Sequence, residues 1–219
     1  MSDEFIPEDS SELKKLVADL QAQIQTLNQK LEGKKPETAH TSETSTTTSQ
    51  SEGQLITESD ATLRRLVQRI AMILQAEKVV IMFYDRELGD LLGIPPAYGV
   101  EEDRLVHFRV RATHGVSGSV FRESKPALYH SVLNDPRTQE DPFSLLNVMN
   151  GITVPLVIEK RDDQNHLVDK TPIGVLHAFN KRHGEDFTDE DVRLLERLAR
   201  NVGAIIANLQ LYREVVEDR

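Results

Sequence analysis

The sequence predicts an α+β fold, in which a mostly antiparallel sheet carries helices on one face. Three observations lead to this prediction. A helical stripe of apolar residues precedes the first strand, short apolar runs are separated by turn residues, and a long helix closes the chain. All three lie within residues 57–216, which we interpret as one domain of this 219-residue chain.

The first helix is expected soon after Thr57, because Ser59 or Asp60 can cap it. Its apolar stripe consists of Leu63, Leu66, Val67, Ile70, Ile73 and Leu74. The run at 79–84 is then apolar, β-branched and aromatic, which is typical of a buried strand. The domain therefore begins with a helix followed by a central strand.

A turn at 89–90 leads to a partner strand at 91–94, which we expect Pro95-Pro96 to end. Further along, apolar residues alternate with His and Arg over 106–111. This alternation predicts a half-buried strand with a basic outer face. Its basic residues are either the exposed side of an edge strand or a cluster that attracts an anionic ligand.

The middle of the domain contains shorter elements. Gly115 and Gly118 flank a tight segment that leads into a short helix around 120–123, and a strand follows at 127–132. Two further apolar runs, at 152–158 and 172–179, are separated by a polar loop. We expect these two runs to pair as a hairpin.

The closing helix has the clearest start signal in the chain. Thr188 and Asp191 have the spacing of a capping box, and Phe187 and Val192 that of a hydrophobic staple. Apolar residues then recur in steps of three and four at Leu195, Leu198, Val202, Ile205, Leu209, Tyr212 and Val216. A helix of roughly 28 residues would be about 42 Å long, which exceeds the width of a small domain.

This length predicts a second role for the helix. We expect a homodimer interface formed by Leu198, Val202, Ile205, Leu209 and Tyr212. The alternative is a long helix that lies on its own sheet. That alternative explains the first half of the helix well and the segment from Leu209 to Val216 less easily.

The segment before the domain divides into three parts. We expect a disordered tail at 1–9, a short coiled-coil helix at 10–32 and a Ser/Thr-rich disordered linker at 33–56. A short tail at 217–219 follows the domain. The coiled-coil prediction rests on the heptad positions Leu13, Val17, Leu20, Ile24, Leu27 and Leu31. A helix that docks on its own domain is the alternative.

Composition excludes several kinds of chemistry. The chain has no Cys, which rules out disulfides, thiolate metal sites and Cys nucleophiles and fits a reducing compartment. The net charge of −10 counts against nucleic acid and anionic membranes as partners. The acidic start and the absence of a long apolar run indicate a cytoplasmic protein.

The order of these elements resembles the GAF domain family of small-molecule sensor modules, over about residues 58–212. The matching segments are 79–84, His114-Gly115-Val116-Ser117-Gly118-Ser119-Val120, Leu133-Asn134-Asp135-Pro136-Arg137, Val154-Pro155-Leu156-Val157, Ile173-Gly174-Val175-Leu176, and Asn180-Lys181 followed by Phe187-Thr188-Asp189-Glu190-Asp191.

The resemblance implies a GAF-like, PAS-related fold, with the first and last helices on one face of the sheet and a ligand pocket on the other. It also implies dimers through those helices. Family ligands include cyclic nucleotides, tetrapyrroles, haem and metabolites, so the cofactor stays unknown. Covalent bilin attachment and the family's methionine sulfoxide reductase branch both need a Cys, which this chain lacks.

Seven residues are candidates for ligand contact: Tyr98, Arg109, Phe121, Tyr129, His177, Asn180 and Lys181. His177 shares a strand face with Val175 and Phe179, so it is either a pocket residue or a core histidine bonded internally. Asn180 and Lys181 match the cyclic-nucleotide motif of the family, but Val192 replaces its final Glu. The capping box and staple explain the rest of that motif without a ligand.

No metal-binding spacing and no catalytic motif occurs in the sequence. We therefore expect a non-enzymatic sensory module that binds a small molecule, dimerises through its terminal helices and signals to a separate output protein. The alternative is a dimerisation scaffold whose pocket is filled by its own side chains. A cyclic-nucleotide binder is a third hypothesis.

Overall fold

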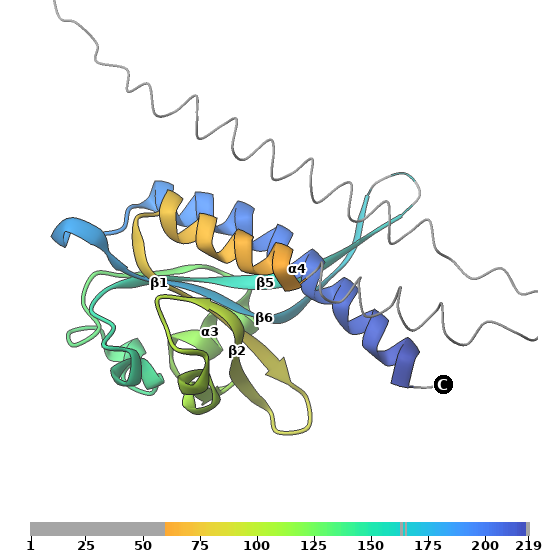
Figure 1. Cartoon of the computed structure of the whole chain (residues 1–219), viewed down its shortest axis with the longest axis horizontal. Helices are drawn as coiled ribbons and strands as arrows, with labels where there is room; N and C mark the ends of the chain where they lie inside the picture. The colour runs from red at the N-terminus through yellow and green to blue at the C-terminus, as the bar shows by residue number, and fades with distance from the viewer. Residues whose placement is uncertain (1–59, 163, 165, 218–219) are drawn as a thin grey trace, which may run out of the picture. The chain divides into compact units, whose positions relative to one another are not determined.

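The computed structural model describes residues 60–162, 164 and 166–217, and the side chains of the last helix as far as Ile206 (Figure 1). The coiled coil predicted for 10–32 and the linker predicted for 33–56 lie outside the described residues. Both therefore stay predictions. The account below concerns the domain that follows them.

A six-stranded antiparallel sheet forms the centre of the domain, with the strand order β3-β2-β1-β6-β5-β4. The strands are β1 (Ala76–Asp85), β2 (Asp90–Tyr98), β3 (Arg109–Arg111), β4 (Ala127–Tyr129), β5 (Gly151–Arg161) and β6 (Leu167–Lys181). The predicted α+β class and antiparallel sheet are confirmed.

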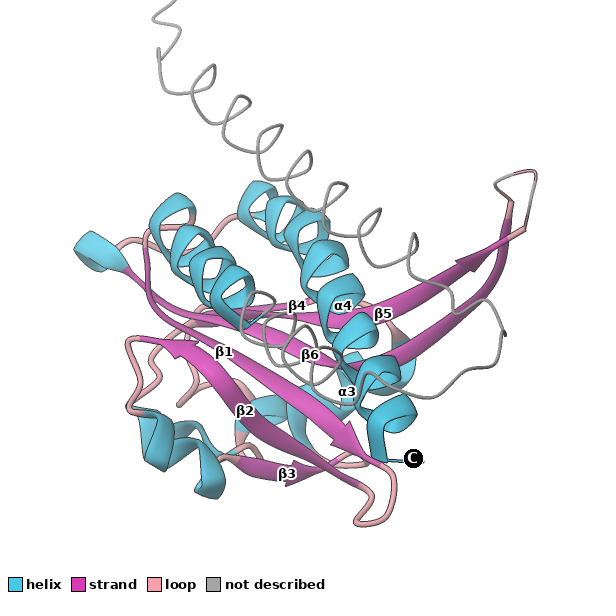
Figure 2. Ribbon diagram, turned by 45° about the vertical axis from the view of Figure 1, so that its right-hand side comes forward, coloured by secondary structure: helices cyan, strands magenta, loops and turns pink. Residues whose placement is uncertain are grey.

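Helices cover both faces of this sheet. The helix at 60–73 and α4 (Asp189–Glu217) lie side by side on one face, and α3 (Gly115–Glu123) lies on the other (Figures 1 and 2). The 3-10 turns are η1 (Glu102–His107), η2 (Pro136–Thr138), η3 (Pro142–Leu146) and η4 (Arg182–Gly184). The first and last helices of the domain thus share a face, as predicted.

The alternation of β1 divides the core into two layers. Val79 and Ile81 face the helix pair, whereas Val80 and Met82 belong to the cluster on the α3 face, and all four are fully buried. The cluster on the α3 face also contains η1 and η3 side chains, such as Leu105 and Leu146. This second layer is the one on which the resemblance places a ligand pocket.

Four predicted boundaries were wrong. β2 continues past Pro95-Pro96, because the two prolines fall in a register shift between the pairs Ile81–Ile94 and Val79–Tyr98, where no ladder bond is required. The strand predicted over 106–111 is reduced to β3, since η1 precedes it and Val106 is exposed.

The other two differences concern the middle segment. α3 begins at Gly115 rather than near residue 120, because the side chains of Glu140 and Asp141 cap its first turn. β4 ends at Tyr129 instead of residue 132, where the chain turns into the segment that contains η2. The first difference depends on contacts between residues 25 positions apart.

The predicted hairpin is confirmed, and it is longer than expected. β5 and β6 pair continuously from Gly151–Phe179 to Arg161–Leu167. β1 covers β6 only from Gly174 onwards. The end of the hairpin therefore extends beyond the rest of the sheet (Figure 2).

The capping box of α4 is also confirmed. The Thr188 backbone N–H donates to Asp191 Oδ2 at 2.9 Å, and the Asp191 N–H donates to Thr188 Oγ1 at 3.3 Å. Phe187 and Val192, the two staple positions, are both buried.

The first half of the predicted dimer interface needs correction. Leu198, Val202 and Ile205 are buried within this single chain, with at most 5% of their surface exposed. They lie on the helix face that packs on the sheet, where Gly203 approaches Val157 of β5. The alternative, a helix lying on its own sheet, accounts for these three residues. The side chains of Leu209 and Tyr212 lie outside the described part.

Gly174 provides a test of the packing between β6 and β1. A Cβ atom at Gly174 would lie 2.1 Å from the Met82 carbonyl oxygen. Gly174→Ala should therefore lower the free energy of unfolding by about 2 kcal/mol or more in urea titrations.

Gly184→Ala is the control. Its φ is +71°, but a Cβ atom added there would have no atom of the described residues within 4 Å. The Gly184→Ala variant should lower the free energy of unfolding by only about 1 kcal/mol. Equal losses in the two variants would contradict the close β6–β1 approach.

Candidate ligand-binding site

His177 lies at the centre of the buried layer between the sheet and α3. β6 places its imidazole on the same face as Val175 and Phe179, and none of its surface is exposed. Aromatic rings surround it, with centroids 4.9 Å away for Phe179, 5.8 Å for Phe143 and 6.1 Å for Phe108. The space on the pocket side of the sheet is thus filled by the protein's own rings.

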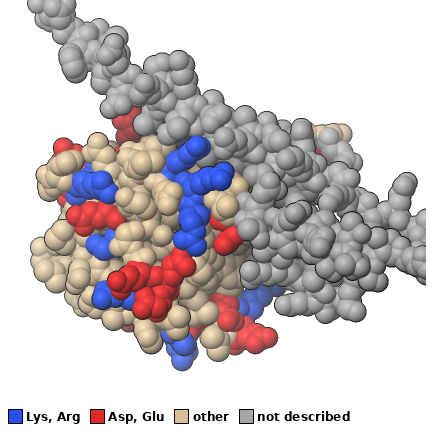
Figure 3. Space-filling view, in the orientation of Figure 1, with Lys and Arg blue, Asp and Glu red and all other residues tan. Residues whose placement is uncertain are grey.

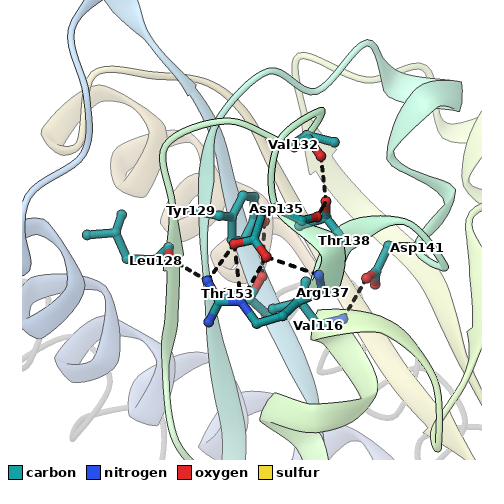
Figure 4. Close-up of polar contacts among 9 residues, drawn as sticks. All are labelled: Val116, Leu128, Tyr129, Val132, Asp135, Arg137, Thr138, Asp141 and Thr153. Carbon is teal, nitrogen blue, oxygen red and sulfur yellow. Dashed lines mark hydrogen bonds and ion pairs between the residues drawn. The ribbon is translucent and has the colours of Figure 1, made fainter.

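A short hydrogen-bond relay ends at this imidazole. The Tyr129 hydroxyl lies 3.1 Å from Thr153 Oγ1, which lies 2.9 Å from His177 Nδ1. The opposite nitrogen, Nε2, is buried and has no hydrogen-bond partner among the described residues. Figure 4 shows Tyr129 and Thr153 side by side on β4 and β5.

The direction of the relay follows from counting the buried groups left unpaired. If Tyr129 donates to Thr153 and Thr153 donates to Nδ1, only the Nε2–H of His177 lacks an acceptor. The reverse direction leaves both the Tyr129 hydroxyl proton and the Nε2 lone pair unpaired. Because each such group costs free energy when buried, the first direction is favoured. His177 then points an N–H donor at the aromatic rings.

Burial keeps this imidazole neutral. Desolvation lowers the pKa of His177 to about 3, because the charged form would lie among apolar rings. Burial likewise raises the pKa of the Tyr129 hydroxyl well above its ordinary value. The relay is therefore uncharged at neutral pH.

Two carboxylates occupy the N-terminus of α3. Asp141 accepts hydrogen bonds from the backbone N–H groups of Val116 and Ser117 and from the Ser117 hydroxyl, and Glu140 accepts from the Gly115 N–H (Figure 4 shows the Val116 contact). Burial raises the pKa of Asp141 to about 6. The usual anion site of a helix start is thus already filled, and an outside phosphate would have to displace it.

Asn180 and Lys181 are used internally rather than free for a ligand. The Asn180 amide accepts from the Met149 N–H at 2.8 Å and donates to Glu77 and to the Asn147 carbonyl. Lys181 forms an ion pair with Asp191 at 3.0 Å, and only 10% of its side chain is exposed. These contacts join the end of β6 to neighbouring loops and to α4.

The remaining predicted residues do not all meet at one place. Tyr129 lies beside His177, and Phe121 belongs to the same cluster but packs against Tyr84, with ring centroids 4.6 Å apart. Arg109 forms an ion pair with Asp90 at the β3 edge. Tyr98 accepts from Arg182 at the rim of the sheet. Of the seven candidates, only Tyr129 and His177 therefore form one site.

A groove lies beside this cluster, between α3 and the segment containing η2. Its volume is about 400 Å³. Val116 and Val120 of α3 line one side, and Arg137 and Glu140 line the other. Arg137 is held by Asp135 and by the Leu128 carbonyl (Figure 4). Val116, Val120 and Ala127 belong both to the wall of this groove and to the buried cluster.

Sequence reasoning missed two residues of the site. Thr153 carries the relay, but a single Thr in an apolar strand has no distinguishing signal. Asp141 has no signal either, because it caps a helix 24 positions earlier in the chain. Within the described residues, no group of three or more His, Asp or Glu side chains could hold a metal ion. No described helix is long and apolar enough to cross a membrane.

Comparison with known proteins identifies the fold. The family model described as "GAF domain" matches residues 57–207. The GAF domain of an Acinetobacter phosphoenolpyruvate-protein phosphotransferase aligns with a TM-score of 0.56 and 16% identity, covering 77% of this chain and 97% of that one. No curated protein matches this chain in sequence.

Two other solved structures have similar scores. Residues 122 to 287 of a methyl-accepting chemotaxis protein align with a TM-score of 0.54 and 20% identity, covering 74% of this chain and 96% of that one. The free methionine-R-sulfoxide reductase of Neisseria meningitidis, in complex with its substrate, aligns with a TM-score of 0.51 and 16% identity, covering 80% and 99%. At these identities the similarity establishes the fold alone.

The buried histidine predicts a pH dependence of stability. The unfolded chain binds a proton at His177 near pH 6.5, and the folded chain does so only near pH 3. The free energy of unfolding should therefore fall by about 1.4 kcal/mol for each pH unit as the pH drops below 6.5. His177→Phe and His177→Gln should both remove this contribution, measured as the difference from the unmodified protein between pH 7 and pH 4.5.

Asp141 has the opposite effect on how stability changes with pH. Its raised pKa means that the folded state holds a proton more tightly between pH 3.8 and about 6, so stability from this group increases as the pH falls. Asp141 is present in the unmodified protein and in both His177 variants. Its contribution therefore cancels when their free energies of unfolding are subtracted. A difference that does not change with pH would contradict a buried neutral His177.

Proposed function

Since this chain belongs to the GAF domain family, a family of sensory and regulatory modules, we propose that it is a non-enzymatic sensor that binds a small uncharged molecule beside His177. The observation that carries this proposal is the buried Nε2 of His177, for which the described part of the chain offers no hydrogen-bond partner. A buried polar group without a partner is rare in folded proteins and requires an explanation. A ligand atom that accepts the Nε2–H would supply it.

The surroundings define the class of ligand. The walls are the rings of Phe108, Phe143 and Phe179, which favour a flat apolar body. A charged ligand would pay a large desolvation penalty among these rings. Phe108 and Phe143 both lie outside the strands, but the Phe108 carbonyl accepts a hydrogen bond from the Gly93 N–H of β2 at 2.8 Å. We therefore propose that Phe143 of η3 is the ring that a ligand would displace. The proposed ligand is therefore planar and neutral, with one hydrogen-bond acceptor.

Signalling is proposed to pass through α4. Gly203 packs on β5, and α4 continues from there to Glu217, or about 21 Å further. In Figures 1 and 2 this last part runs on past the helix at 60–73. The sequence places Leu209, Tyr212 and Val216 there at heptad spacing. We propose that this segment pairs with a second copy and that a separate protein receives the signal.

A dimerisation scaffold without a ligand is the second candidate. It is favoured by the filling of the inner layer, where Phe108, Tyr129, Phe143 and Phe179 are all at most 1% exposed. In this case the ring cluster is simply core, and the Nε2–H rests against the faces of neighbouring rings.

Other functions have less support. The Cys required by the reductase branch is missing, which supports a non-enzymatic role and, with the reducing compartment it fits, a cytoplasmic one. Cyclic-nucleotide binding is disfavoured because Asn180 and Lys181 are bonded internally and carboxylates fill the N-terminus of α3.

Native mass spectrometry of the purified protein separates the two candidates. The sensor hypothesis predicts a dimer with an additional mass of a neutral organic molecule, which denaturation releases. His177→Phe should remove that mass and leave the dimer intact, because the proposed contact is the Nε2–H. A dimer without additional mass, from protein purified under several growth conditions, would favour the scaffold.

The dimer itself is tested by charge at the end of α4. Leu209→Glu combined with Tyr212→Glu should yield a monomer in sedimentation equilibrium, with the melting temperature of the domain almost unchanged. Ala207→Glu with Leu211→Glu is the matched control, because these residues fall on the opposite side of the helix. A double variant at 209 and 212 that stays dimeric would refute this interface.

A further inference from the structure

Thr153 is the residue through which the sheet controls the hydrogen bonding of His177. The two residues are direct partners across β5 and β6, and Thr153 Oγ1 lies 2.9 Å from His177 Nδ1. Both side chains are fully buried. Because water does not reach either group, the Thr153 hydroxyl determines which ring nitrogen of His177 carries the proton.

Gly151 allows the Tyr129 hydroxyl to reach Thr153. β4 and β5 pair Tyr129 with Gly151. A Cβ atom at Gly151 would lie 2.8 Å from the Tyr129 hydroxyl oxygen and 2.9 Å from a ring carbon of Phe179. Since no side chain stands there, the Tyr129 ring extends along β5 until its hydroxyl lies 3.1 Å from Thr153 Oγ1 (Figure 4).

The two hydroxyl groups of the relay have unequal effects on His177. Without the Tyr129 hydroxyl, donation from Thr153 to Nδ1 still leaves only the Nε2–H unpaired, whereas the reverse direction leaves the Thr153 proton and the Nε2 lone pair unpaired. Without the Thr153 hydroxyl, either form of the neutral imidazole leaves one N–H and one lone pair unpaired. Thr153, and not Tyr129, therefore holds the proton on Nε2.

No buried charge competes with this hydrogen-bonding preference. Figure 3 shows charged side chains of both signs spread over the visible face of the domain. Among the described residues, the charged side chains that are buried belong to Asp90, which pairs with Arg109, and to Asp141, which caps α3. Beside His177, the choice between an N–H and a lone pair at Nε2 is thus the main polar feature that a ligand meets.

We propose that Thr153 is a specificity-determining residue that acts through His177: by donating to Nδ1 it keeps Nε2 a hydrogen-bond donor, so the site selects a planar ligand with an acceptor over an analogue with an N–H in the same place. This inference rests on the ligand site proposed beside His177. An N–H of the ligand would face the Nε2–H, donor against donor. The imidazole would present a lone pair instead only by giving up the favoured direction of the relay, which leaves further buried groups unpaired.

The test opens a cavity of one ring beside the imidazole. Phe143→Ala removes a ring whose centroid lies 5.8 Å from that of His177. An apolar cavity of this size can bind benzene. The probes are pyridine, which is an acceptor, pyrrole, which is a donor, and benzene, which is neither. Their dissociation constants for the full chain carrying Phe143→Ala are measured by NMR titration at neutral pH, where pyridine is uncharged.

We expect pyridine to bind about tenfold or more tightly than pyrrole, with benzene between them. Adding Thr153→Val should reduce this preference to about twofold or less, chiefly because pyrrole binds more tightly once Nε2 can present a lone pair. Tyr129→Phe is the matched control, since it removes the other hydroxyl of the relay and should retain the preference. Equal binding of pyridine and pyrrole without these additions would overturn the proposal, as would an equal effect of the two substitutions.

A second measurement does not require the cavity. With Phe143 in place, nitrogen-15 NMR should show the proton of His177 on Nε2 in Tyr129→Phe and divided between the two nitrogens in Thr153→Val. A proton that stays on Nε2 in Thr153→Val would contradict the role of Thr153.

The proposed function fails separately from this inference. It requires that the unmodified protein binds a ligand with displacement of Phe143, whereas the probe experiment supplies the space by mutation. Probe preferences as expected, together with an unmodified chain that retains no ligand, would support the role of Thr153 and count against the sensor. A retained ligand without any dependence on Thr153 would do the reverse.

Discussion

The burial of one imidazole among aromatic rings is the constraint on which the inner half of this domain depends. Desolvation keeps His177 neutral, and its Nδ1 must then be paired, which requires Thr153 opposite it on β5 and Tyr129 on β4. The relay therefore links the side chains of three neighbouring strands. It also leaves one N–H donor inside an apolar layer, and this donor is the basis of the proposed ligand site.

The two faces of the helix pair have different chemistry. The inner face packs apolar residues such as Leu66 and Leu198 against the sheet, whereas the outer face carries exposed charged residues of both signs. A change in the inner layer can reach the outer surface only through the sheet and these two helices. A ligand would alter the output only if it bound one arrangement of the helices more tightly than another.

Local patterns predicted the elements better than the site. The capping box at Thr188 and Asp191 was predictable because its signal lies within four residues. The hairpin of β5 and β6 was predictable because each strand is a short apolar run and a single polar loop separates the two runs. Asp141 and Thr153 were not, since their roles depend on partners 24 positions away. The heptad pattern of α4 was ambiguous for a physical reason: a stripe that packs on a sheet and a stripe that pairs with another helix have the same spacing, and burial assigns Leu198, Val202 and Ile205 to the sheet.

The most direct test of the central claim is nitrogen-15 NMR of the histidine side chains, recorded with long-range proton couplings from pH 7 to pH 4. The account predicts that His177 stays neutral throughout, with its proton on Nε2 and with slow exchange of that proton with water. A His177 signal that titrates near pH 6.5, or that carries its proton on Nδ1, would contradict both the direction of the relay and the donor on which the proposed ligand site depends.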